Sequence, residues 1–526
     1  MFNSRIPALR NQALIGIGLF GLAIWAAWQS GGKIAAGDTV SLVYYALGFA
    51  GCVVVVAILR NWRAGFFLFF VWLMFEDLAR KFMGNEMVFF FGKDILLFFV
   101  YISLFVAIRS HKEKAFRPPF LLILSLFVWL GVLQIFNQNS PHILYGLLGF
   151  KVYFYYIPLM WVGYALIRND LDLRRLLMLN AVLATIIAGL GIAQAILGNS
   201  FLNPAVLAPE LQDLGDLQKA TPLSNQLFSL PSSEFVSAGR FSAYLIIVVI
   251  LVLGSAGYLL LTRQKGRKLI FLALGTVGVA ALFCGNRGTL LISIASLGVL
   301  GICFLWGAPW RQRQAHRALK SVRRSLVVAG ASLALFIFLF PEQAGSRIDY
   351  YTETLMPSSS AYQLESRTWS YPIENLEGAF DRPHWILGNG IGTASLGMQY
   401  VAKLTHTPPP KLWVEEGFGD MIVEMGILAP FLWIAWGIAL LYHSWKVVKQ
   451  LKQTRFFPLA IAIFWYAFLL IFPLTYGSLS GYQDYICNAY LWLFVGVLFR
   501  LPEVLATGAP AIVPNRATVS RGGFQF

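Results

Sequence analysis

The sequence predicts an all-α integral membrane protein of about 12–14 transmembrane helices, with one large periplasmic loop between late spans. Hydrophobic residues make up 58% of the 526 residues, charged residues only 13%, and the mean hydropathy is +0.66. No soluble core could bury so much apolar chain. Apolar segments recur from end to end, and two long polar stretches interrupt them, residues 198–240 and 342–418.

Fourteen apolar segments are candidates for membrane spans: residues 12–28, 40–59, 65–75, 88–108, 120–136, 143–167, 176–197, 241–261, 269–284, 289–306, 325–341, 419–442, 458–474 and 486–499. The third is shorter than the roughly 20 residues that cross the hydrocarbon core, so it is either re-entrant or continues through Glu76 and Asp77 where protein shields them. We expect these carboxylates to be neutralised by Arg80 and Lys81. The chain then divides into a helical bundle over 1–341, the loop 342–418, and C-terminal helices with a cytoplasmic tail over 419–526.

The net charge of +16 indicates topology rather than a nucleic-acid partner. Of the 41 Lys and Arg residues, 28 lie in short segments that flank the spans on the side that also holds both termini. The positive-inside rule assigns this side to the cytoplasm and places residues 198–240 and 342–418 on the opposite side of the membrane. The basic residues are dispersed and form no aromatic-rich platform, which excludes nucleic-acid binding. No convincing cleavage site follows the first apolar run, so we expect that span to be retained.

Four arginines at the predicted outer face are candidates for binding an anionic ligand. Arg287 lies in a tight Gly-Asn-Arg-Gly turn between two apolar runs, and Arg367 lies within the large loop. Arg240, at the end of the other loop, and Arg347 are weaker candidates, since an arginine at a span end can simply anchor to lipid phosphate. Guanidinium groups bind phosphate through two parallel hydrogen bonds, which makes a phosphate-bearing ligand the natural expectation.

The large loop also holds a glycine-rich turn and candidate bases. Free N–H groups at Gly388, Gly390 and Gly392 could cradle phosphate, although alternate glycines are equally common in an ordinary tight turn. Glu415 and Glu416 stand before the span 419–442, where a carboxylate can act as a base or merely favour a helix N-terminus.

Four short motifs, at residues 285–288, 365–369, 387–392 and 423–428, occur in order around the long outer loop. Together they resemble the O-antigen ligase and Wzy-type polysaccharide polymerase superfamily of bacterial multi-pass membrane proteins, over roughly the half of the chain from Arg240 onward. The resemblance implies transfer of a glycan from an undecaprenyl-diphosphate carrier to a sugar acceptor at the periplasmic face, without metal or nucleotide sugar. It implies that the arginines hold the carrier diphosphate. It also implies that a flippase or a chain-length regulator is a partner, besides membrane lipid.

The chain departs from the ligases of this superfamily at one position. Those enzymes carry a histidine several residues before the Glu-x-Gly of the last motif, whereas this chain has Glu415 and Glu416 there and His406 further upstream. These three residues are therefore the candidate bases, and a polymerase of exopolysaccharide, O-antigen or capsule repeat units is the first prediction. The alternatives are an O-antigen ligase acting on lipid A-core, a secondary transporter of a small anion such as bicarbonate, and a scaffold without catalysis. A transporter would bind at the bilayer midplane within internal repeats, and no such repeat is evident.

Overall fold

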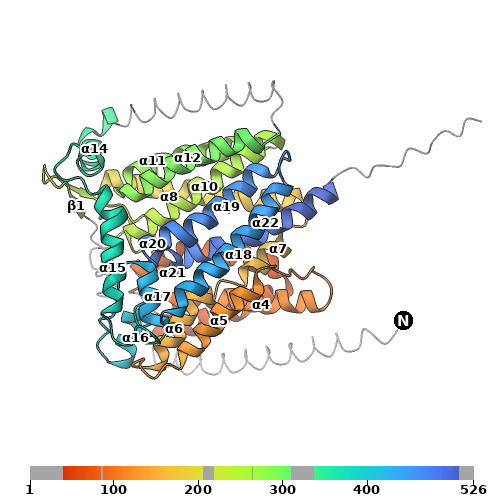
Figure 1. Cartoon of the computed structure of the whole chain (residues 1–526). Helices are drawn as coiled ribbons and strands as arrows, with labels where there is room; N and C mark the ends of the chain where they lie inside the picture. Colours follow the sequence, from red (N-terminus) through yellow and green to blue (C-terminus); the bar gives the residue numbers. More distant parts are fainter. Residues whose placement is uncertain are drawn as a thin grey trace, which may run out of the picture. The chain divides into compact units, whose positions relative to one another are not determined.

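The computed structural model describes residues 39–84, 87–204, 218–262, 265–309, 334 and 337–508, which form helices and one small two-stranded sheet (Figure 1). The chain splits into two compact units. Unit 1 comprises Met1–Trp72 and Phe91–Lys112, and unit 2 comprises Leu73–Phe90 and Glu113–Phe526.

Unit 1 contains α2 (Thr39–Arg60), the first half of α3 (Trp62–Phe82) and most of α4 (Met87–Arg109). The helices and strands that lie wholly in unit 2 are, in chain order, α5 (Leu121–Ile135), α6 (Ile143–Phe154), α7 (Leu159–Leu166), α8 (Asp170–Leu197), β1 (Gln218–Ala220), β2 (Leu227–Ser229), α10 (Ala238–Thr262), α11 (Arg267–Phe283), α12 (Arg287–Gly307), α14 (Pro341–Leu355), the π-helix η1 (Ser366–Ser370), α15 (Tyr371–Phe380), α16 (Met398–Thr405), α17 (Gly417–Met425), α18 (Leu428–Gln450), α19 (Phe457–Leu469), the π-helix η2 (Leu470–Leu474), α20 (Thr475–Gly477), α21 (Ser480–Gln483) and α22 (Tyr485–Gly508).

The predicted all-α membrane class is confirmed. Eight helices among the described residues are long and apolar enough to cross a membrane, and each coincides with a predicted span. Four other predicted spans are also helices, namely α2, α3, α5 and α11. Of these, α5 and α11 are shorter than the eight, and α3 carries more charge. The predicted spans 12–28 and 325–341 fall wholly or largely outside the described residues. The periplasmic location of the large loop stays a prediction.

Glycines allow the central helices of unit 2 to touch backbone to backbone. A Cβ atom on Gly163 of α7 would lie 2.1 Å from the carbonyl oxygen of Leu493, and one on Gly496 of α22 would lie 2.0 Å from that of Met160. Within a membrane the hydrophobic effect does not drive helices together, because lipid is as apolar as their side chains. Small residues stabilise the helix pair by permitting close van der Waals contact. The pair α7 and α22 therefore forms a reciprocal glycine interface.

Ion pairs in unit 2 lie at the two ends of its helices. At one end, Arg455 pairs with Asp170 at 2.8 Å, in segments predicted to be cytoplasmic. At the other end, Arg240 pairs with Asp484 at 2.6 Å, and α14 to α17 lie at this end as well (Figure 1). We call these the inner and outer ends, after the predicted sidedness of the segments that form them.

The predicted span 419–442 is interrupted at Gly426. This residue has φ of +85°, a conformation that suits glycine, and it separates the nine-residue α17 from the membrane helix α18. A Cβ atom at Gly426 would lie 2.5 Å from the carbonyl oxygen of Ile386, because the backbone of the glycine-rich turn packs there. The membrane helix therefore begins later than predicted, and α17 belongs to the outer end.

The two-ended arrangement makes the sidedness testable by cysteine labelling. In a chain whose four native cysteines have been replaced, a cysteine at Ser358, in the outer loops, should react with a membrane-impermeant maleimide on intact cells. A cysteine at Thr507, near the end of α22, should react only after permeabilisation. The reverse pattern would invert the topology.

Candidate functional site

Arg287 is presented at the outer end by the tight turn that the sequence predicts. Asn286 caps α12 by accepting hydrogen bonds from the N–H groups of Gly288 and Thr289, at 2.9 and 3.3 Å, and Gly285 turns the chain with φ of +69°. Arg287 is the first residue of α12. Its guanidinium donates one hydrogen bond, of 2.8 Å, to the side-chain oxygen of Gln363.

Arg367 lies one helical turn beyond Gln363. The helix that contains Arg367 begins at residue 364 and continues through the π-turn η1 into α15, past Pro372, which is the second residue of α15. The guanidinium of Arg367 stacks on the ring of Tyr371, 4.3 Å from its centre. π-Turns often occur at functional sites.

Glu415 joins the same group. One of its carboxylate oxygens accepts a hydrogen bond from the hydroxyl of Tyr371, and the other lies 3.8 Å from a guanidinium nitrogen of Arg367. The side chains of Arg367 and Glu415 are 49% and 35% exposed, so solvent and ligands can reach them. We call Arg287, Gln363, Arg367, Tyr371 and Glu415 the rim cluster.

Both arginines of the rim cluster keep hydrogen-bond donors available. The guanidinium of Arg287 uses one nitrogen, on Gln363, and that of Arg367 makes no hydrogen bond to the described residues. A guanidinium carries five N–H donors in a planar fork. Most of these donors are therefore open to an anionic ligand.

Arg240, by contrast, is engaged in an ion-pair network. It donates to Asp77 at 2.5 Å and to Asp484 at 2.6 Å, and its side chain is 17% exposed. The expected neutralisation within residues 76–81 is confirmed for Asp77 and Arg80, which pair at 2.8 Å. Lys81 instead donates to Ser232 and Ser233.

Arg347 is likewise part of the scaffold. It is buried, and its three guanidinium nitrogens donate to the backbone oxygens of Phe283, Gln343 and Ser229 at 2.7–2.9 Å. Burial lowers the pKa of Arg347 from its usual value. These contacts attach α14 to the end of α11 and to β2, so this arginine does not join the rim cluster.

The glycine-rich turn is bound to α17 rather than open to a phosphate. The N–H of Gly390 donates to the backbone oxygen of Glu424 at 2.9 Å, and that of Gly392 donates to its carboxylate at 3.1 Å. The N–H of Gly388 donates to His384 at 2.7 Å. All three N–H groups are therefore used, and of the two interpretations offered by the sequence the geometry supports the ordinary tight turn.

The carboxylate of Glu424 also receives hydrogen bonds from Ala394 N, Ser395 Oγ and Tyr153 Oη, at 2.8–3.0 Å. Glu424 is completely buried. It thereby ties the glycine-rich turn to α17 and to α6.

Glu416 is a buried helix cap. Its carboxylate accepts the N–H of Gly419 at 2.5 Å at the start of α17, and only 1% of the residue is exposed. Burial raises its pKa from 4.5 to about 7. One turn further, burial and the charges of Glu424 and Glu416 raise the pKa of Asp420 well above its usual range.

His406 stands apart from the rim cluster. It ends α16 with φ of +53° and is exposed. The structure thus joins Arg287, Arg367 and Glu415, and it places Glu416 and His406 elsewhere.

Sequence reasoning missed Gln363 and Tyr371. Together with Arg367 they recur every four residues, the spacing that places side chains on one face of a helix, and this signal was available. The partners of Arg240 come from α3 and from the segment before α22. No spacing in the sequence indicates that these segments meet.

A scan of family models, a search of curated proteins and a search of solved structures each found no match.

The buried cap makes stability depend on pH in a defined direction. Because the pKa of Glu416 is raised on folding, its stabilising contribution is complete below pH 4.5 and is lost as the pH rises through 7. The loss should be on the order of 3 kcal/mol. Glu416→Gln keeps a capping oxygen, so its unfolding temperature should fall less than that of the wild type between pH 5 and 8. The exposed Glu377→Gln is the control, and equal pH profiles for Glu416→Gln and the wild type would contradict the assignment.

Proposed function

We propose that the chain is a polymerase of exopolysaccharide, O-antigen or capsule repeat units. It would transfer a glycan from an undecaprenyl-diphosphate carrier to a sugar acceptor at the outer face of a bacterial cytoplasmic membrane. The observation that carries the proposal is the rim cluster, in which Arg367 lies beside the accessible carboxylate of Glu415 and Gln363, one helical turn away, binds Arg287. The resemblance of the four motifs to polysaccharide polymerases and ligases adds to it.

Arg287 and Arg367 take the carrier diphosphate in this proposal. Two planar guanidinium groups can each bind phosphate oxygens through paired hydrogen bonds, and they stabilise the negative charge that develops on the leaving group. Gln363 holds the first of them in place and lies one turn from the second. The outer end is where a membrane-embedded carrier would expose its diphosphate.

The reaction is an inverting displacement at the anomeric carbon of the donor glycan. The hydroxyl oxygen of the acceptor forms a bond to this carbon, while the bond to the diphosphate oxygen breaks and its electron pair leaves with undecaprenyl diphosphate. The carboxylate of Glu415 takes the hydroxyl proton and later releases it to water.

The ion pair between Arg367 and Glu415 suits a resting state. At 3.8 Å the pair is longer than a direct hydrogen bond, and both groups are partly solvated, so it is weak. A bound diphosphate would replace Glu415 as the partner of Arg367. The hydrogen bond from Tyr371 then keeps the carboxylate oriented.

Arg287→Lys and Arg367→Lys should each reduce polymer formation from purified lipid-linked repeats by about 10- to 100-fold, because lysine loses the planar fork. Protein level and unfolding temperature should stay unchanged. Lys411→Gln, an exposed cation of the same outer loops, is the control. Full polymer output in both Lys variants would exclude the diphosphate assignment.

The base is identified by comparing three variants in the same assay. Glu415→Gln should lower turnover by about 10²-fold or more, the usual contribution of a general base. Glu416→Gln and His406→Ala should stay close to the wild type, since Glu416 caps α17 and His406 is the exposed C-cap residue of α16, with no hydrogen bond or ion pair to the rim cluster among the described residues. Normal turnover in Glu415→Gln would leave leaving-group stabilisation by the arginines as the whole mechanism, and a loss confined to His406→Ala would move the base there.

The glycan phenotype of a deletion strain distinguishes the remaining alternatives. Accumulation of single lipid-linked repeats supports a polymerase. Complete polymer that fails to reach lipid A-core would identify a ligase. Unchanged glycans with a lost anion uptake would identify a transporter.

A further inference from the structure

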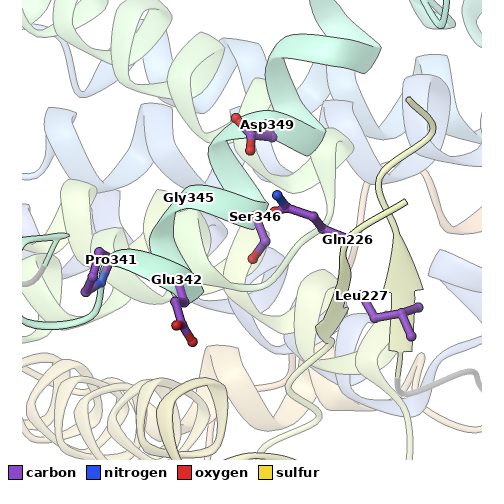
Figure 2. Close-up of a pocket in the computed structure, with 7 residues that line it drawn as sticks. All are labelled: Gln226, Leu227, Pro341, Glu342, Gly345, Ser346 and Asp349. Atoms are coloured by element: carbon purple, nitrogen blue, oxygen red, sulfur yellow. The ribbon is translucent and has the colours of Figure 1, made fainter. Parts of the chain in front are cut away.

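A second polar site lies beside α14, away from the rim cluster. A pocket of about 570 Å³ opens between the start of α14 and the β-hairpin, and it is lined by Gln226, Leu227, Pro341, Glu342, Gly345, Ser346 and Asp349 (Figure 2). The hairpin is the antiparallel pair of β1 and β2. Four of the seven lining side chains are polar, and no Lys or Arg is among them.

Among the described residues, the polar side chains of the pocket have no hydrogen-bond partners. Ser346 is only 7% exposed, yet its hydroxyl makes no hydrogen bond to the described residues. The same holds for the side chains of Gln226, Glu342 and Asp349 within the described part of the chain. By contrast, Glu353 on the same helix accepts the N–H of Leu223 at 2.8 Å. A nearly buried polar group without a partner is a site that a ligand can satisfy.

The walls of the pocket are held in place by contacts outside it. Arg347 donates to Ser229, the carboxylate of Glu353 binds the hairpin, and the rings of Phe228 and Tyr350 pack 5.4 Å apart. Helix α14 and the hairpin are therefore fixed to one another before any ligand arrives. Such pre-organisation reduces the cost of binding.

We propose that this pocket binds the acceptor glycan through sugars that carry no negative charge. Two carboxylates accept hydrogen bonds from hydroxyl or amino groups, Gln226 and Ser346 can both donate and accept, and Leu227 and Pro341 offer an apolar wall to a sugar ring. The same carboxylates repel phosphates and uronic acids, which separates this pocket from the site for the carrier diphosphate. The glycan's role as acceptor rests on the proposed function.

Helix α14 connects the pocket to the rim cluster. The backbone N–H of Gln363, which binds Arg287 through its side chain, donates to the backbone oxygen of Thr354 at the other end of this helix. Ser346 and Thr354 are eight residues apart, which corresponds to about 12 Å along the helix axis. An oligosaccharide that extends from the rim cluster along α14 would therefore reach the pocket, so the site selects a chain rather than a single sugar.

Gly345 offers a clean test, because a Cβ atom there would meet no atom within 4 Å. Gly345→Trp should fill the pocket, whereas Gly345→Ala adds only a methyl group and favours the helix. The probe is a set of end-labelled oligosaccharides released by partial hydrolysis from the surface polysaccharide of the host strain. Their dissociation constant is measured by fluorescence anisotropy on the purified full-length chain, with the unfolding temperature as the check of folding.

Gly345→Trp should raise the dissociation constant at least about tenfold, and Asp349→Asn should raise it several-fold by removing a strong acceptor. Gly345→Ala and Glu377→Gln should bind as the wild type does. No binding by the wild type at millimolar oligosaccharide, or equal binding by a folded Gly345→Trp variant, overturns the pocket assignment.

Arg367→Lys separates this inference from the proposed function. It should leave oligosaccharide binding unchanged while reducing turnover by the same factor of about 10 to 100. If turnover survives in Arg367→Lys but Gly345→Trp still loses binding, the proposed function fails and the glycan pocket stands.

Discussion

The buried carboxylate of Glu424 is the interaction on which the outer end depends. A carboxylate removed from water is costly unless several donors compensate it, and this one receives two backbone N–H groups and two hydroxyls. Because these donors come from the glycine-rich turn and from α6, a single side chain fixes three segments. The burial of the carboxylate raises its pKa, and the hydrogen bonds oppose this shift. The short α17, and with it the approach of Glu415 to the rim cluster, is set by this arrangement.

The arginines of the outer end divide according to how many of their donors the protein uses. Arg347 gives all three nitrogens to backbone oxygens, and Arg240 is neutralised by two aspartates. Such buried charges with complete partners hold segments together, and breaking them would leave a charge uncompensated. Arg287 and Arg367 keep their donors because each lies where the protein supplies few acceptors. Arginine therefore stabilises the scaffold at positions 240 and 347 and suits ligand binding at positions 287 and 367.

Helix α14 links the two polar sites of the outer end. Its C-terminal end is bonded to Gln363 and so to Arg287, and its N-terminal half lines the pocket beside the hairpin. The two sites have opposite electrostatic character, since one presents guanidinium groups and the other carboxylates. In the proposed reaction the donor presents an anionic diphosphate and the acceptor presents hydroxyl-rich sugars, so each site has the character that suits one of the two substrates. This correspondence is the reason to consider both sites together.

The sequence by itself determined the fold class, because hydropathy is a sum over residues and needs no knowledge of neighbours. It also determined the turn at Arg287, since the Gly-Asn pair caps a helix through bonds within four residues. It could not show that Gly426 divides a predicted span, because the cause is the distant backbone at Ile386. Nor could it separate Arg240 and Arg347 from Arg287 and Arg367, or Glu416 from Glu415. The partners of Arg240, for example, are Asp77 and Asp484, both more than a hundred residues away, and only the tertiary structure brings them together.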